Sequence, residues 1–143
     1  MTFRPADFHR LNRAILAVHA APTMAQFATH LLQALREVVR GDIAVVDWKG
    51  GALEGGRPLT DQPQGLSADV NAALRRHLPD NPMYLRRHRA TSISDVLPHR
   101  AWQRSALYGE AYGRLGQQDG LGIDIALGAD QVLTLNTTRA RRG

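Results

Sequence analysis

Apolar residues recur at helical spacing in the first part of the chain. Phe8, Leu11, Ile15 and Val18 fall on one stripe of a helix over about residues 7–20. A stripe this narrow is typical of a helix that packs against another helix, in the same chain or in a second copy. Pro22 ends the first helix, because proline disfavours helical geometry in the residue before it.

A second helix is predicted to begin directly after this break. The sequence Thr23-Met24-Ala25-Gln26 has the form of a capping box. An apolar face then recurs at helical spacing, formed by Phe27, Leu31, Leu35 and Val38. Gly41 is placed to cap the C-terminal end of this helix.

Two regions show the alternation that predicts strands. Residues 43–48 are rich in β-formers, and residues 49–52 predict a hairpin turn. Residues 121–127 alternate apolar with small or polar side chains, which predicts a strand with one buried face. A turn at residues 128–130 leads into a partner strand over residues 131–137. We therefore expect one hairpin early in the chain and one late.

The segment between the hairpins predicts helices and a short strand. Ser67 caps a third helix, after a loop rich in glycine and proline, and residues 90–94 read as a short edge strand. Asp95 or Pro98 begins a fourth helix that runs to about Gly113. One face of this fourth helix holds Trp102, Ala106, Gly109 and Tyr112.

This order of elements predicts an α+β fold. Two hairpins need a common antiparallel sheet, and the helices must cover at least one of its faces. Residues 59–118 cross the sheet between the hairpins, so we expect them to roof a small-molecule pocket lined by aromatic side chains and a few polar groups. We expect a single domain over residues 1–138, followed by a basic tail over residues 139–143.

Composition narrows the class of protein. The 143 residues fit one domain, and the absence of cysteine excludes disulfides, thiolate chemistry and cysteine-containing zinc sites. No apolar run approaches the roughly 18 residues of a membrane span, and the N-terminus lacks the apolar core of a signal peptide. We therefore expect a soluble, cytoplasmic protein.

Positive charge is concentrated in one region. The chain has a net charge of +5, and residues 75–104 alone sum to +5. Arg86, Arg87 and Arg89 are the candidates for contact with nucleic acid. The alternative is a solvated face together with a general bias towards arginine, since 17 of the 18 basic residues are arginine.

No catalytic or metal-binding pattern is present. The six histidines show no His-x-x-x-His spacing, and no Gly-x-Ser-x-Gly occurs. Asp95 is most simply a helix cap, and Glu110 is expected to pair with Arg114 one turn on. The sequence therefore predicts a protein that is not an enzyme and that carries no metal and no cofactor.

The candidates for ligand contact are aromatic. Trp102, Tyr108 and Tyr112 are expected to line the pocket, with Trp48 opposite them on the first hairpin and Tyr84 as a lid. The alternative is that aromatic residues at helical spacing form plain core.

Several spaced features together carry a resemblance to a known family. They are Asn81-Pro82, Ser94-Asp95, Trp102, the run Leu107-Tyr108…Glu110…Tyr112, and Leu115-Gly116…Gln118. On these residues the chain resembles the N-terminal GAF-like domains of LuxR-type transcriptional regulators. The family's C-terminal helix-turn-helix is absent from this sequence, and Gly113-Arg114 stands where relatives often have Arg-Pro.

The resemblance implies a GAF/PAS-like antiparallel sheet flanked by helices. It implies a non-enzymatic regulatory domain that binds a small-molecule effector or a partner protein, and that dimerises, with the N-terminal helices as the expected interface. DNA would be bound only through a domain absent from this chain. Two alternatives stay open: a dimerisation module whose pocket is filled by its own aromatics, and a basic nucleic-acid binder acting through residues 75–104.

Overall fold

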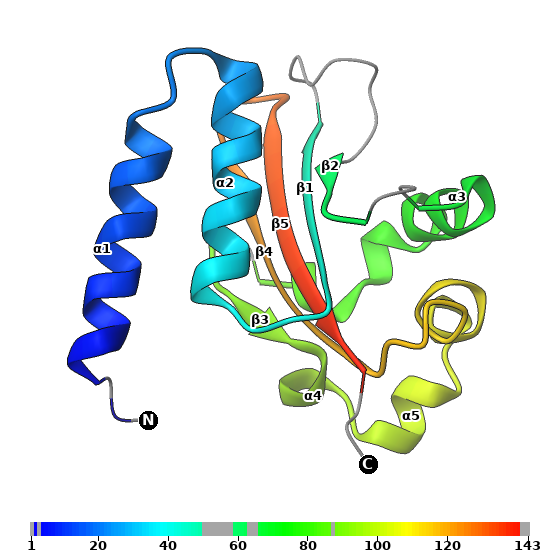
Figure 1. Cartoon of the computed structure of the whole chain (residues 1–143). Coiled ribbons are helices and arrows are strands. Elements are labelled where there is room, and N and C mark those ends of the chain that lie inside the picture. The colour runs from blue at the N-terminus through cyan, green and yellow to red at the C-terminus, as the bar shows by residue number, and fades with distance from the viewer. Residues whose placement is uncertain (1, 3, 50–58, 63–65, 87, 141–143) are drawn as a thin grey trace.

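The computed structural model describes residues 2, 4–49, 59–62, 66–86 and 88–140 (Figure 1). The helical elements are α1 (Pro5–His19), α2 (Met24–Val38), α3 (Ala68–Arg76), two short 3-10 turns (Leu78–Asp80 and Pro82–Tyr84), α4 (Ile93–Val96), α5 (His99–Gln103) and a π-helix (Tyr108–Tyr112). The strands are β1 (Ile43–Lys49), β2 (Leu59–Thr60), β3 (Thr91–Ser92), β4 (Asp119–Ala126) and β5 (Val132–Arg139). None of the described helices is both long and apolar enough to cross a membrane.

The strands form one sheet in the order β2-β1-β5-β4-β3, and all its pairs are antiparallel. The last strand, β5, lies at the centre, because it pairs with β1 on one side and with β4 on the other. Helices flank both faces (Figure 1). The predicted α+β class, an antiparallel sheet flanked by helices, is confirmed.

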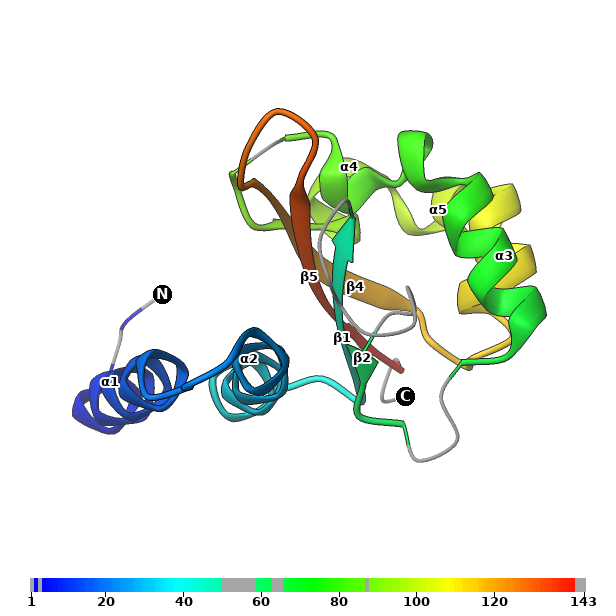
Figure 2. The same cartoon turned by 90° about the horizontal axis from the view of Figure 1, so that it is seen from above.

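The first two helices lie on one face of this sheet. Thr23 caps α2 by accepting a hydrogen bond from the Gln26 amide at 3.2 Å, as the capping box predicts. Side chains of α2 bury the face of β1 that carries Ala44 and Val46. Helix α1 packs along α2 and lies on the far side of it from the sheet (Figure 2).

The apolar stripe predicted for α1 is partly exposed. Phe8 is 54% exposed, Leu11 38% and Ile15 45%, whereas Ala14 is buried. The predicted helix is therefore present, and α2 covers its stripe only in part. About half of the apolar surface of Phe8, Leu11 and Ile15 stays exposed in a single copy of the chain.

The other face of the sheet is covered by the segment between the hairpins. Trp102, Met83 and Ile93 are almost completely buried there. A Cβ atom on Gly120 would lie 2.8 Å from the Met83 sulfur, and one on Gly122 would lie 2.9 Å from the Tyr84 ring. These glycines therefore permit close packing of a helical turn over β4.

The fourth helix was predicted to be continuous to about Gly113, and this prediction is wrong. Pro98 separates α4 from α5, and the Ser105 hydroxyl ends α5 by donating to the Trp102 carbonyl at 2.7 Å. The same hydroxyl accepts the Tyr108 amide at 3.1 Å, and a π-helix follows. Because the helix is interrupted and then widened, Ala106 and Gly109 are exposed while Trp102 and Tyr112 are buried.

Three local predictions also need correction. The cap position of α4 is Ser92, so Asp95 lies inside the first turn and is not its cap. Helix α2 ends at Val38 with Val39 as its C-cap, so Gly41 is not the cap. Glycine is needed at position 41 because a Cβ atom there would lie 1.7 Å from the Thr137 hydroxyl. The strand returning from β1 is β2, further along the chain than expected, and the predicted turn lies mostly outside the described residues.

Candidate functional site

A small cavity lies between the sheet and the segment that crosses it. Its volume is about 70 Å³. Aliphatic residues from the sheet and from the covering segment form much of its wall: Ile43, Val45, Leu66, Leu74, Leu78 and Leu115. Its polar lining residues are Asp47, Asn71, Arg75, Asn81, Tyr84, Tyr112, Thr134, Asn136 and Thr138. A pocket was expected in this position, but its lining is more polar and less aromatic than predicted.

The register of the strands arranges the polar floor in rows. Asp47 of β1 and Asp124 of β4 both lie opposite Thr134 of the central strand. The next row on this face has Asn136 at its centre, because alternate side chains of a strand point the same way. The Thr134 hydroxyl donates to the Asp124 carboxylate at 2.8 Å. The floor therefore has an acidic end.

Two tyrosines face this floor from the covering segment. The Tyr84 hydroxyl accepts a hydrogen bond from the Asn136 side-chain amide at 2.7 Å, which ties the 3-10 turn to β5. Burial raises the pKa of Tyr84 well above its usual range, and nearby Tyr112 adds to the shift. Burial raises the pKa of Tyr112 in the same direction. Both phenols are therefore neutral near pH 7, and the Tyr112 hydroxyl donates to the Met83 sulfur at 3.9 Å.

Trp102 and Tyr108 lie behind the cavity wall instead of lining it. The Trp102 indole donates to the Gln118 carbonyl at 2.9 Å, and the Gln118 side chain donates to the Tyr108 hydroxyl at 2.8 Å. The Trp102 ring meets Tyr112 edge-on at 5.0 Å and Tyr108 at 5.6 Å between centroids. These contacts fix the position of Tyr112, which does line the cavity.

Trp48 lies on the opposite face of the sheet. It packs with the cluster beneath α2 that contains Val46 and Leu133. The expectation that Trp48 faces the tyrosines is therefore wrong. Side chains on β1 alternate, so Asp47 faces the cavity and its neighbour Trp48 faces α2.

The polar floor was missed because its residues alternate with apolar ones. Asp47, Thr134 and Asn136 occupy positions that would face solvent if the sheet had a single covered face. Here both faces are covered, so these polar side chains point into the protein. The sequence did contain one signal for this floor. Asp47 is a carboxylate inside the β-rich run of residues 43–48.

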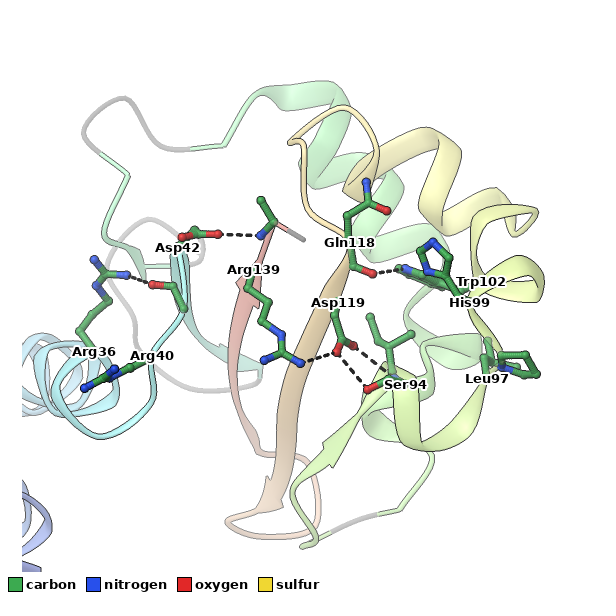
Figure 3. Close-up of a pocket in the computed structure, with 14 residues that line it drawn as sticks. Arg36, Arg40, Asp42, Ser94, Leu97, His99, Trp102, Gln118, Asp119 and Arg139 are labelled. Atoms are coloured by element: carbon green, nitrogen blue, oxygen red, sulfur yellow. Dashed lines mark hydrogen bonds and ion pairs between the residues drawn. The ribbon is translucent and has the colours of Figure 1, made fainter. Parts of the chain in front are cut away.

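A larger groove lies at the end of the sheet where β5 finishes (Figure 3). Its volume is about 820 Å³, and Trp102 contributes to its wall. The Asp119 carboxylate accepts from the Ser94 amide at 3.2 Å, from the Ser94 hydroxyl at 3.0 Å and from Arg139 at 3.1 Å. Asp42 accepts from the backbone of Ala140 at 2.6 Å. Because both carboxylates already have hydrogen-bond partners, they have less need of a polar ligand than the polar groups of the cavity have.

The charged side chains of the covering segment hold it together. Glu110 binds Arg76 at 2.6 Å and His77 at 3.0 Å, which joins the π-helix to the end of α3. The prediction that Glu110 pairs with Arg114 is therefore wrong. Hydrogen bonds from His77 and then Arg76 lower the pKa of Glu110 below its ordinary value.

The basic loop is only partly described. Arg86 and Arg89 are exposed between the second 3-10 turn and β3, and Arg87 lies outside the described residues. Across the part of the chain that the structure covers, no three histidine or carboxylate side chains come together as a metal site.

Comparison with known proteins gives a fold and no close relative. No protein-family model matches the sequence, and a search of curated proteins finds no match. The ligand-binding domain of VqsR from Pseudomonas aeruginosa superposes with a TM-score of 0.61 at 14% identity, covering 97% of this chain and 83% of that one.

A second solved structure gives the same result. CepR2 from Burkholderia cenocepacia, described as an N-acylhomoserine lactone-dependent LuxR-family transcription factor, superposes with a TM-score of 0.64 at 12% identity. The match covers 97% of this chain and 81% of that one. The chain therefore has the fold of the ligand-binding domains of LuxR-family regulators.

Proposed function

We propose that this chain is a non-enzymatic, cytoplasmic sensory domain of a transcriptional regulator, and that a small-molecule effector binds in the cavity over β1 and β5. The observation that carries the proposal is the cavity itself, which has a polar floor and, in its wall, the buried Tyr112 and the partly buried Tyr84. Partly enclosed cavities with a few convergent polar groups are the usual form of small-molecule sites. The fold shared with LuxR-type ligand-binding domains supports the same function.

The mechanism is a shift between two packings of the covering segment. Tyr84 and Tyr112 both touch the cavity, and Glu110 ties the π-helix to α3. A ligand that binds one packing more tightly draws the whole segment towards it. The segment would then move as one unit relative to the sheet.

We also propose that the chain forms a homodimer through α1. The stripe of Phe8, Leu11 and Ile15 is exposed although its spacing suits helix packing. A second copy would cover this surface. The same observation supports the alternative of a dimerisation module without a ligand, in which the two tyrosines occupy the pocket.

A thermal-shift screen tests the effector proposal. The panel contains amines, amino acids, polyols, carboxylates and N-acyl homoserine lactones, because any ligand selective for the folded state raises the unfolding temperature. Leu74→Phe fills the cavity and should abolish the shift, whereas the matched control Leu127→Phe, at a residue that is 47% exposed, should keep it. A shift of equal size in both variants would refute the cavity as the site, and no shift with any compound would favour the dimerisation module.

A further inference from the structure

We propose that the cavity selects a small nitrogen-bearing ligand, of the short amine or amino-alcohol class, whose N–H groups donate to the Asp47 carboxylate. This inference rests on the proposed effector site and names the chemistry that the site would recognise. It also separates this chain from CepR2, whose description names an acyl lactone.

Among the residues that the structure describes, the Asp47 carboxylate that lines the cavity has no hydrogen-bond or ion-pair partner. It lines the cavity from β1 and is only partly exposed. It makes no hydrogen bond or ion pair with any residue in the described part of the chain, whereas Asp124, on the same row, already accepts the Thr134 hydroxyl. A partly buried carboxylate gains most from a charged or strongly polarised N–H donor.

The charge around Asp47 favours a cation. Asp124 lies two strands away on the same face, roughly 10 Å across the sheet. Burial is the main cause of the raised pKa of Tyr84, and the charges of Asp124 and Asp47 add smaller contributions in the same direction. Arg75 is the basic residue of the described lining, but it is exposed and already has an interaction of its own.

A second polar group points to a ligand with more than one hydrogen-bonding function. Thr138 lines the cavity from β5 and is only 6% exposed. Its hydroxyl is buried and has no hydrogen-bond partner within the described part of the chain. Buried polar groups in folded proteins are almost always paired, so an unpaired hydroxyl in a cavity wall is a place for a ligand or water group.

The volume sets an upper limit on ligand size. The cavity's 70 Å³ is well below the roughly 300 Å³ at which drug-sized sites begin. A volume of this size favours a short amine over a long acyl chain.

Ligand-observed NMR on the intact chain tests the inference. The probes are ethylamine and ethanolamine, the uncharged control ethanol, the anionic control propionate, and N-butanoyl and N-octanoyl homoserine lactone. A ligand of about four heavy atoms reaches a Kd of tens of micromolar at best, so titrations should extend to millimolar concentrations. We expect ethanolamine and ethylamine to bind more tightly than ethanol and propionate.

The variant Asp47→Asn should weaken binding of both amines by about tenfold or more, the loss typical of a hydrogen bond to a charged group. The matched control Asp130→Asn removes a charge from an exposed turn and should leave the Kd unchanged. Tighter binding of propionate or of a lactone, or an unaltered Kd in Asp47→Asn, would overturn the inference while leaving the effector site standing. Binding of none of the probes, together with no response to the wider metabolite panel, would overturn both.

Discussion

The close approach of the second 3-10 turn to β4 gives a quantitative prediction. In Gly122→Ala the new Cβ would lie 2.9 Å from the Tyr84 ring, 3.0 Å from Met83 Cβ and 3.3 Å from the Met83 sulfur. Met83 is completely buried, so it cannot move away without disturbing its neighbours. Overpacking of this kind costs about 1–3 kcal/mol of folding free energy.

A further loss is expected if Tyr84 moves. The ring would be pushed from β4, and its hydroxyl would lose the bond from Asn136, at a cost of about 1 kcal/mol. The sum, about 2–4 kcal/mol, should lower the unfolding midpoint clearly in urea denaturation followed by circular dichroism.

The chain offers a matched control for this substitution. Gly109 lies in the π-helix, and a Cβ atom there would meet nothing within 4 Å. Gly109→Ala should be neutral or more stable by up to about 1 kcal/mol, because alanine reduces the entropy of the unfolded chain. If Gly122→Ala unfolds within about 0.5 kcal/mol of the unmodified chain, the spread expected for surface changes, the close packing over β4 is refuted.

Two further predictions concern the charged bridge and the exposed helix. Because the pKa of Glu110 is lowered in the folded state, its stabilisation is complete above its ordinary pKa and is lost as the pH falls through the folded value. Glu110→Gln should therefore flatten the acid limb of a stability–pH profile, and an identical limb in both proteins would contradict the bridge. Leu11→Glu or Ile15→Glu should convert a dimer to a monomer in sedimentation velocity, while a monomer in the unmodified chain would contradict the α1 interface.

Elements with a strong period were predictable from the sequence. The α1 and α2 patterns gave helices close to those observed, and the cap at Thr23 was predicted from local chemistry alone. The late hairpin was predicted because alternation over residues 121–127 and 131–137 defines both its strands and its turn. These features depend on residues that are close in the sequence, so they could be predicted from the single sequence.

Features that depend on tertiary packing were not predictable in the same way. The prediction of a continuous fourth helix failed because Ser105 ends one helix and caps the next. Its position in the sequence does not reveal this role. Glu110 bonds to α3 across the fold instead of to its helical neighbour. The face of Trp48 was assigned wrongly because a sheet covered on both sides lets polar and apolar residues both point inward.

The central claim is that the cavity over β1 and β5 is the effector site, and amide chemical-shift mapping tests it most directly. A ¹H–¹⁵N titration with ethanolamine should perturb Val45, Thr134 and Asn136 on the sheet and Tyr84 above it, with little change in α1. Perturbations concentrated at Ser94 and Asp119, in the groove at the end of the sheet, would contradict the account.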